Sequence, residues 1–148
     1  RKTVMISFVP ATGSDHEIAR ALLEQGHLPT DILSSTAGEL WIMRDADAVA
    51  VGGFEFYGED ALLRSVAVES ASRGSGIGSR LVESLLEEAA RRGVKRGWLL
   101  TETAEGFFRK KGFARSERTA ITNPGLLGSA EFTHVCATTA VCMRKDIE

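Results

Sequence analysis

The stretch of sequence that decides the fold is Arg73-Gly74-Ser75-Gly76-Ile77-Gly78. It follows a nearly continuous apolar run, Ala61–Val68, and precedes apolar residues at helical spacing over Ile77–Ala89. A strand that passes through a glycine-rich turn into a helix leaves the first backbone N–H groups of that helix without partners. With the helix dipole these groups form an anion site, and the Arg73 guanidinium adds a charge suited to phosphate. The stretch therefore predicts a site for a ligand that carries a pyrophosphate.

Two common pyrophosphate-binding motifs do not fit this stretch. No Gly-Lys-Ser/Thr follows it, so it is not a Walker loop. Gly74, Gly76 and Gly78 alternate with other residues, whereas the dinucleotide fingerprint has two residues before its last glycine. The glycines alone also fit a turn that only caps a helix. The arginine, the spacing and the long amphipathic helix together weigh against that simpler interpretation.

Apolar runs and helical periodicity extend outward from this stretch in both directions. The sequence predicts strands at Thr3–Val9, Leu40–Arg44, Ala48–Tyr57, Ala61–Val68, Val94–Thr101, from Phe113, and at Thr139–Arg144. It predicts helices before Gly26, from Pro29, before Gly93, at Thr103–Lys111 and, as a helical turn, within Leu126–Val135. A tight turn at Asp45–Asp47 is expected to join two strands in a hairpin. This order of elements predicts an α+β fold, a three-layer α/β/α sandwich around a mixed, mostly antiparallel sheet.

Composition narrows the function classes. The 148 residues fit one domain, 1–148, and the net charge of -2 gives no cationic field for nucleic acid. No apolar run is long enough to cross a bilayer, so no membrane partner is expected. Two cysteines are too few for a disulfide-built fold, which favours a cytoplasmic protein with reduced thiols.

Two motifs resemble those of the GNAT acetyltransferase superfamily. Val66-Ala67-Val68-Glu69, Arg73-x-x-Gly76-x-Gly78 and Leu81-Val82 resemble its motif A, and Ala104-x-x-Phe107-Phe108-x-x-x-Gly112-Phe113 resembles its motif B. The resemblance implies the GNAT fold, with the sheet splayed at an acetyl-CoA site, and N-acetyl transfer from acetyl-CoA as cosubstrate. The cofactor-binding residues that it implies are Val66, Ala67, Val68, Arg73, Gly74, Ser75, Gly76, Ile77, Gly78, Ser79 and Phe108. It also implies an oxyanion donor at a backbone N–H near Val66, and a homodimer.

Narrower resemblances bear on the acceptor. The run from Trp98 to Ala104, with Phe107-Phe108, is similar to the acetyltransferase domain of N-acetylglutamate synthases. Ala61–Ser65 and the tail Glu131-Phe132…Cys136…Ala140-Val141-Cys142-Met143 resemble GNAT proteins encoded in bacterial arsenic-resistance operons. These resemblances imply a small amino-acid-like amine as substrate, with organoarsenicals among the candidates. They place Thr101 and Thr103 at the substrate.

Arg64 interrupts an otherwise apolar strand. A guanidinium is costly to bury without a partner, and it can bind a carboxylate through two parallel hydrogen bonds. If the substrate is an α-amino acid, Arg64 is the candidate that binds its carboxylate. The alternative is a structural salt bridge to Glu55 or Glu102.

Acetyl transfer needs a base that removes a proton from the ammonium and a donor that protonates the departing thiolate. Many GNAT relatives use a Tyr four residues before the Gly that ends the motif B helix, where this chain has Phe108. Tyr57 is the candidate acid in its place, and Glu55 lies two residues away on the same strand face. Glu55 is the candidate base and Glu102 its rival. For all three, an ordinary strand-end or surface role is the alternative, and water can also carry the protons.

Other residues leave alternatives open. Cys136 and Cys142 are core residues, a disulfide, or paired thiolates for a soft ion. His16, His27 and His134 are scattered, and no spacing predicts a zinc site. Two rival functions also stay open: protein N-acetylation, and a catalytically silent module that binds acetyl-CoA or senses arsenic.

Overall fold

The computed structural model describes residues 6–35, 38–45, 48–135 and 139–147. Residues 3–5 of the expected first strand, residues 46–47 of the expected hairpin turn, and Cys136 lie outside these ranges. The strands are β1 (Ile6–Pro10), β2 (Gly38–Asp45), β3 (Ala48–Tyr57), β4 (Asp60–Val68), β5 (Arg96–Thr101), β6 (Ala114–Arg115) and β7 (Val141–Asp146). The α-helices are α1 (His16–Gln25), α2 (Ile77–Arg91), α3 (Glu105–Lys110) and α4 (Pro124–Leu127). Short 3-10 segments lie at Gly13–Asp15, Asp31–Leu33, Ser70–Ser72 and Arg118–Ala120, and a π-helical turn lies at Glu131–Val135.

Over the described residues, the strands form a seven-stranded sheet in the order β1-β2-β3-β4-β5-β7-β6. The pairs β1–β2, β5–β7 and β6–β7 are antiparallel, whereas β4 and β5 are parallel. The chain divides into two compact units, Arg1–Phe54 with Ser65–Leu85, and Glu55–Arg64 with Leu86–Glu148. Mixed strand directions and flanking helices are what the order of elements in the sequence predicts.

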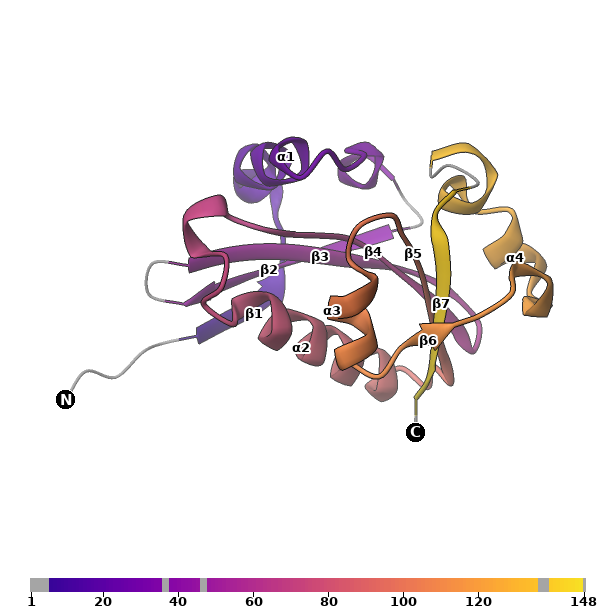
Figure 1. Cartoon of the computed structure of the whole chain (residues 1–148). Coiled ribbons are helices and arrows are strands. Elements are labelled where there is room, and N and C mark those ends of the chain that lie inside the picture. The colour runs from indigo at the N-terminus through magenta and orange to yellow at the C-terminus, as the bar shows by residue number, and fades with distance from the viewer. Residues whose placement is uncertain (1–5, 36–37, 46–47, 136–138, 148) are drawn as a thin grey trace. The chain divides into compact units, whose positions relative to one another are not determined.

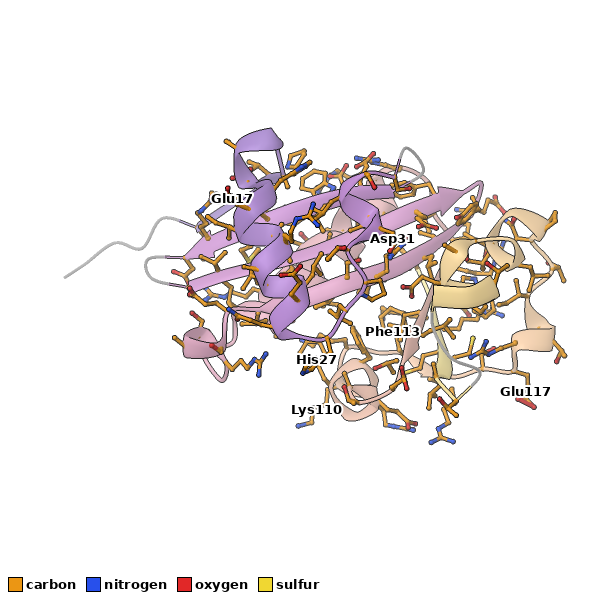
Figure 2. The ribbon with its side chains drawn as sticks, turned by 90° about the horizontal axis from the view of Figure 1, so that it is seen from above. Glu17, His27, Asp31, Lys110, Phe113 and Glu117 are labelled. Carbon is orange, nitrogen blue, oxygen red and sulfur yellow. The ribbon has the colours of Figure 1, made fainter. Side chains whose placement is uncertain are left out.

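In the first unit, helices cover both faces of β2 and β3 (Figure 1). Figure 2, the view from above, shows α1 with Glu17 lying across the strands. The apolar side of α1 packs in a cluster of Ala19, Leu22, Leu23, Ile32, Leu40, Ile42, Val51 and Ala67. On the opposite face, a Cβ added to Gly52 would lie 2.8 Å from Leu85 Cδ1 and 3.1 Å from Leu81 Cδ2. The missing side chain at Gly52 therefore lets α2 approach β3 closely.

The second unit has its own apolar cluster, formed by Leu62, Trp98, Ile121, Leu126 and Cys142, with Tyr57, Leu100 and Phe132 packed against it. Cys142 is a buried core residue, the first of the three alternatives for the cysteines, and burial raises the pKa of its thiol. In the part of the chain that the structure describes, no helix has the length and apolar character needed to cross a bilayer.

Helix α1 ends in a Schellman motif whose left-handed residue is not a glycine. His27 N–H donates to Glu24 O at 3.1 Å, and Leu28 N–H donates to Leu23 O at 2.8 Å. Gly26, the stop expected from the sequence, is the C-cap with an ordinary φ of -85°. The left-handed conformation falls on His27, with φ of 56°.

Replacing His27 by Gly is therefore expected to raise the free energy of unfolding by about 1 kcal/mol, because glycine carries no Cβ penalty in this region. Helix α2 already uses this solution, with Gly93 at φ of 83° in the same position. Urea unfolding measures the change. The control is Gln25→Gly in the last helical turn, which should lower the stability instead. A His27→Gly variant no more stable than the parent would contradict this account of the helix end.

Candidate functional site

The glycine-rich turn joins β4 to α2 in the first unit. Gly74 has φ of 86° and Gly76 has φ of 87°, in the left-handed region that favours glycine. A Cβ placed on either residue would meet no atom within 4 Å, so open space lies beside both. The turn thus combines a backbone conformation that only glycine adopts readily with room for a ligand to approach the main chain.

Hydrogen-bond donors gather at this turn. Among the described residues, the N–H groups of Gly74 and Gly76 make no hydrogen bond. The first helical bond of α2 runs from Arg80 N–H to Gly76 O at 3.1 Å. Arg73 is exposed and forms no ion pair with another described side chain. Backbone donors, a helix start and a guanidinium therefore lie together, as the binding of a pyrophosphate requires.

Strand β4 has an unusual backbone conformation before this turn. Its parallel pairing with β5 runs from Asp60 to Leu62, where the described register ends. Further along the strand, Ser65 has φ of 63°, a left-handed residue of the kind found at β-bulges, which redirect a strand. Ala67 is buried in the cluster beneath α1, while Val66 lies on the α2 face, 3.3 Å from the Cβ position of Gly52. The splayed sheet that the family resemblance implies stays a prediction.

Two residues predicted to bind the cofactor have side chains in the core. Ile77 is fully buried, so only its backbone is available to a ligand. Phe108, in the second unit, is 7% exposed and packs edge-to-face on Phe107 and Phe113, with ring centroids 5.0 and 5.9 Å away. The aromatic ring at the position of the usual Tyr thus helps to anchor α3. The cofactor roles of both residues stay predictions.

A buried polar cluster occupies the second unit, and we call Glu55, Tyr57, Arg64 and Glu131 the Arg64 cluster. Arg64 Nη1 donates to Glu55 Oε2 at 2.8 Å, and Arg64 Nη2 lies 3.5 Å from Glu131 Oε2. Tyr57 donates its hydroxyl proton to Glu55 Oε1 at 2.5 Å. The exposed fraction of the Arg64 side chain is 0%, against 4% for Glu55 and 5% for Glu131. The cluster therefore holds three charged groups away from water.

Tyr57 is fixed in this cluster from several sides. Burial, and then the hydrogen bond and charge of Glu55, raise the pKa of the Tyr57 phenol, and Arg64 opposes this shift. Asn123 Nδ2 donates to the Tyr57 carbonyl at 2.6 Å and to Asp60 Oδ2 at 3.1 Å. The phenol consequently stays protonated at neutral pH, with its proton directed at Glu55.

Asp60 is hydrogen-bonded to three segments of this unit. Its carboxylate accepts hydrogen bonds from Arg96 and from the Trp98 indole, both at 2.8 Å. Burial alone raises the pKa of Asp60, but the hydrogen bonds from Arg96, Trp98 and Asn123 outweigh it and lower that pKa. Asp60, ionised at neutral pH, thus links the start of β4, strand β5 and the segment that carries Asn123.

The structure brings some of the predicted acceptor-site residues together and leaves others apart. Glu55 and Tyr57 share a strand face, as their spacing predicts. Arg64 forms a salt bridge with Glu55, one of the two partners that the structural alternative named. Glu102 and Thr103 are exposed and are not members of this cluster. The buried Thr101 hydroxyl accepts from Ala104 N–H at 3.0 Å just before α3 begins. The substrate and catalytic roles stay predictions.

Glu131 is the member that sequence reasoning missed as a functional candidate. It lies in the π-helical turn between α4 and β7, far from Arg64 in the sequence. In the sequence, Glu131 stands out only within the tail that resembles the GNAT proteins of arsenic-resistance operons. Nothing in the local pattern of residues marks its side chain as buried.

An open cavity of about 670 Å³ lies beside β6 and β7 in the second unit. Its lining residues are Arg115, Ser116, Glu117, Arg118, Thr119, Ala140, Val141 and Cys142. None of the predicted catalytic residues lines it. Within the described ranges, no group of three or more His, Cys, Asp or Glu side chains is arranged to hold a metal ion.

Comparison with solved structures places this fold among acetyltransferases. A Mycobacterium tuberculosis protein in complex with CoA aligns at 23% identity over 96% of this chain and 99% of its own, with a TM-score of 0.80. N-acetylglutamate synthase from Neisseria gonorrhoeae, complexed with coenzyme A and L-arginine, aligns at 14% identity over 99% of this chain, with a TM-score of 0.79. This chain spans only 34% of that enzyme. The Escherichia coli ribosomal-protein-S18-alanine N-acetyltransferase aligns at 17% identity over 97% and 95% of the two chains, with a TM-score of 0.72.

These neighbours confirm the predicted fold, and the CoA in two of them supports the expected acetyl-CoA cosubstrate. They do not support an association with arsenic resistance, which stays a prediction. No match is found among curated proteins. Residues 36–115, more than half of the chain, match the family described as acetyltransferase (GNAT) domain. The chain therefore belongs to the GNAT acetyltransferase family.

Proposed function

We propose that this protein is an acetyl-CoA-dependent N-acetyltransferase that acts on a small, amino-acid-like amine by direct attack. The observation that carries the proposal is the turn before α2, where Gly74 and Gly76 present free N–H groups beside open space. Arg73 stands next to them without an ion-pair partner among the described residues. These groups match the charge and hydrogen-bonding needs of the CoA pyrophosphate.

The reaction needs little covalent chemistry from the protein. The neutral amine attacks the thioester carbonyl carbon, a C–N bond forms, and the carbonyl electrons move onto oxygen. When the tetrahedral intermediate collapses, the C–S bond breaks and its electron pair leaves with the CoA thiolate. A backbone N–H near Val66 is the proposed donor to the oxyanion. Positioning of the two reactants supplies much of the rate.

Proton transfer sets the roles of the side chains. The acceptor arrives as an ammonium and must lose one proton before attack. Its nitrogen loses a second proton as the amide forms, and the departing thiolate gains one, so these last two transfers balance. Phe108 has no proton to donate. Glu55 and Tyr57 already share a hydrogen bond, whereas Glu102 is exposed and in contact with water. We therefore assign proton removal to Glu55 or Glu102, and protonation of the thiolate to Tyr57 or to water.

Release of free thiol from acetyl-CoA across a panel of amines tests the proposal. The panel should include glutamate, phosphinothricin and arsinothricin, decarboxylated amines, and a short peptide with a free N-terminus. We expect amine-dependent thiol release with at least one small amine. Turnover with the peptide alone would favour protein N-acetylation. Binding of acetyl-CoA without any turnover would favour a silent binding module. A homodimer and a cytoplasmic location stay predictions.

A further inference from the structure

A second guanidinium lies close to the glycine-rich turn, on the first helical turn of α2. It belongs to Arg80, which is ion-paired with Asp45, the last residue of β2. We propose that this pair is a latch: when acetyl-CoA binds, Arg80 leaves Asp45 and binds a phosphate group of the ligand. The inference rests on the proposed function and deepens it. It adds one residue to the phosphate site and identifies a contact that opposes binding.

The geometry of a helix directs the Arg80 side chain toward the glycine-rich turn. In an α-helix the Cα–Cβ bonds tilt toward the N-terminus, so a side chain covers the helical turn that precedes its own Cα. Arg80 N–H donates to Gly76 O at 3.1 Å, so the preceding helical turn is the one that Gly76 begins. The stem of Arg80 therefore lies along the part of α2 next to Gly76, within reach of a phosphate held there.

The alternation of side chains along β2 places Asp45 on the same side of the sheet as α2. Arg44 and Asp45 are consecutive strand residues, so their side chains point to opposite faces. Arg44 pairs with Asp15 just before α1, whereas Asp45 pairs with Arg80 on α2. Figure 1 shows α1 and α2 on opposite faces of β2 and β3, with the end of β2 beside the start of α2. A carboxylate thus lies on the face that carries the phosphate site.

The ion pair is of a kind that a phosphate can displace. The exposed fraction of the Arg80 side chain is 39%, and that of Asp45 is 13%. Water and salt screen a partly exposed pair, so it contributes little to stability and costs little to break. A phosphate group carries more negative charge than a carboxylate and accepts two parallel hydrogen bonds from one guanidinium. Arg80 therefore gains by exchanging Asp45 for a phosphate of the ligand.

Isothermal titration with acetyl-CoA tests the latch. Asp45→Asn should raise the affinity about threefold to fivefold, because Arg80 no longer has to leave a carboxylate. Arg80→Gln should lower the affinity about tenfold, since one charged hydrogen-bond donor is lost. The matched controls are Asp15→Asn and Arg44→Gln, which break a pair of nearly equal exposure, 13% and 41%, on the other face of β2. Both controls should leave the affinity unchanged. An Arg80→Gln variant that binds as tightly as the parent would overturn the inference.

The double variant, Asp45→Asn with Arg80→Gln, separates the latch from simple charge repulsion. Without Arg80, the substitution of Asp45 removes only the repulsion between its carboxylate and the ligand. Its gain in affinity should therefore be smaller in the Arg80→Gln background than in the parent. An equal or larger gain in that background would mean that Arg80 stays with Asp45 when acetyl-CoA binds, and would overturn the inference.

Titration with dephospho-CoA, which lacks the 3′-phosphate, identifies the phosphate group. A gain from Asp45→Asn that persists with this ligand supports a latch that opens onto the pyrophosphate, and a gain that is lost supports one that opens onto the 3′-phosphate. The failures of the two proposals are distinguishable. If the parent does not bind acetyl-CoA, the proposed function fails. If the parent binds it, and Asp45→Asn binds no more tightly than Asp15→Asn, only the latch fails.

Discussion

Replacing Gly76 by Val should lower the affinity for acetyl-CoA by at least about a hundredfold, the effect expected when two hydrogen bonds to a charged group are lost. Gly76 has φ of 87°, which a β-branched residue adopts only at a cost, so the turn must shift its N–H groups. The new side chain would also occupy space that is now open beside the main chain. Isothermal titration with acetyl-CoA measures the loss.

Gly93→Val is the matched control for this variant. Gly93 has nearly the same φ, 83°, and an added Cβ there would also meet no atom within 4 Å. It lies after the end of α2, away from the turn at its start. Both variants should lose a similar amount of stability, about 1–2 kcal/mol, but only Gly76→Val should lose affinity. If Gly76→Val binds acetyl-CoA as tightly as the parent, the pyrophosphate site is not at this turn.

Arg64→Ala should lower the free energy of unfolding by about 3–5 kcal/mol, the usual cost of removing one partner of a buried ion pair. The change leaves Glu55 and Glu131 buried without the cation that they share. Urea denaturation, followed by circular dichroism, measures the loss. A second substitution, Glu131→Gln, should restore part of the stability, because it replaces one of the two buried carboxylates by a neutral amide.

Arg109→Ala provides the contrast of an exposed ion pair. Arg109 lies 2.6 Å from Glu105, closer than Arg64 lies to Glu55, but 60% of its side chain is exposed. Its loss should cost less than about 1 kcal/mol. Arg64→Ala could instead lower the free energy of unfolding no more than this control does, and raise KM for amino-acid acceptors. Arg64 would then bind a substrate carboxylate, and its role as a structural ion-pair partner would be contradicted.

Local sequence patterns were sufficient to predict the glycine-rich turn before α2. A glycine-rich run between an apolar strand and an amphipathic helix needs no long-range information, and Gly74 and Gly76 adopt the left-handed conformation that such a turn requires. The two-residue period of a strand likewise predicted that Glu55 and Tyr57 share a face. Both predictions depend on residues close together in the chain.

The rest depended on contacts that local patterns do not encode. Glu131 reaches Arg64 through the fold, and a short helical turn does not reveal which of its residues is buried. Prediction from neighbouring residues also has a limit, which the end of α1 shows. Gly26 is the stop expected from the sequence, yet the next residue, His27, adopts the left-handed conformation. The side chain of Thr101, predicted to bind substrate, accepts a backbone hydrogen bond from Ala104.

The most direct measurement follows the acetyl group itself. The protein is incubated with acetyl-CoA labelled in its acetyl group and with the best amine from the panel, and the products are separated by mass spectrometry. Transfer to nitrogen predicts labelled amide and free CoA in equal amounts, with no release in the absence of the amine. Labelled acetate without amide would mean hydrolysis of the thioester, and would contradict an N-acetyltransferase.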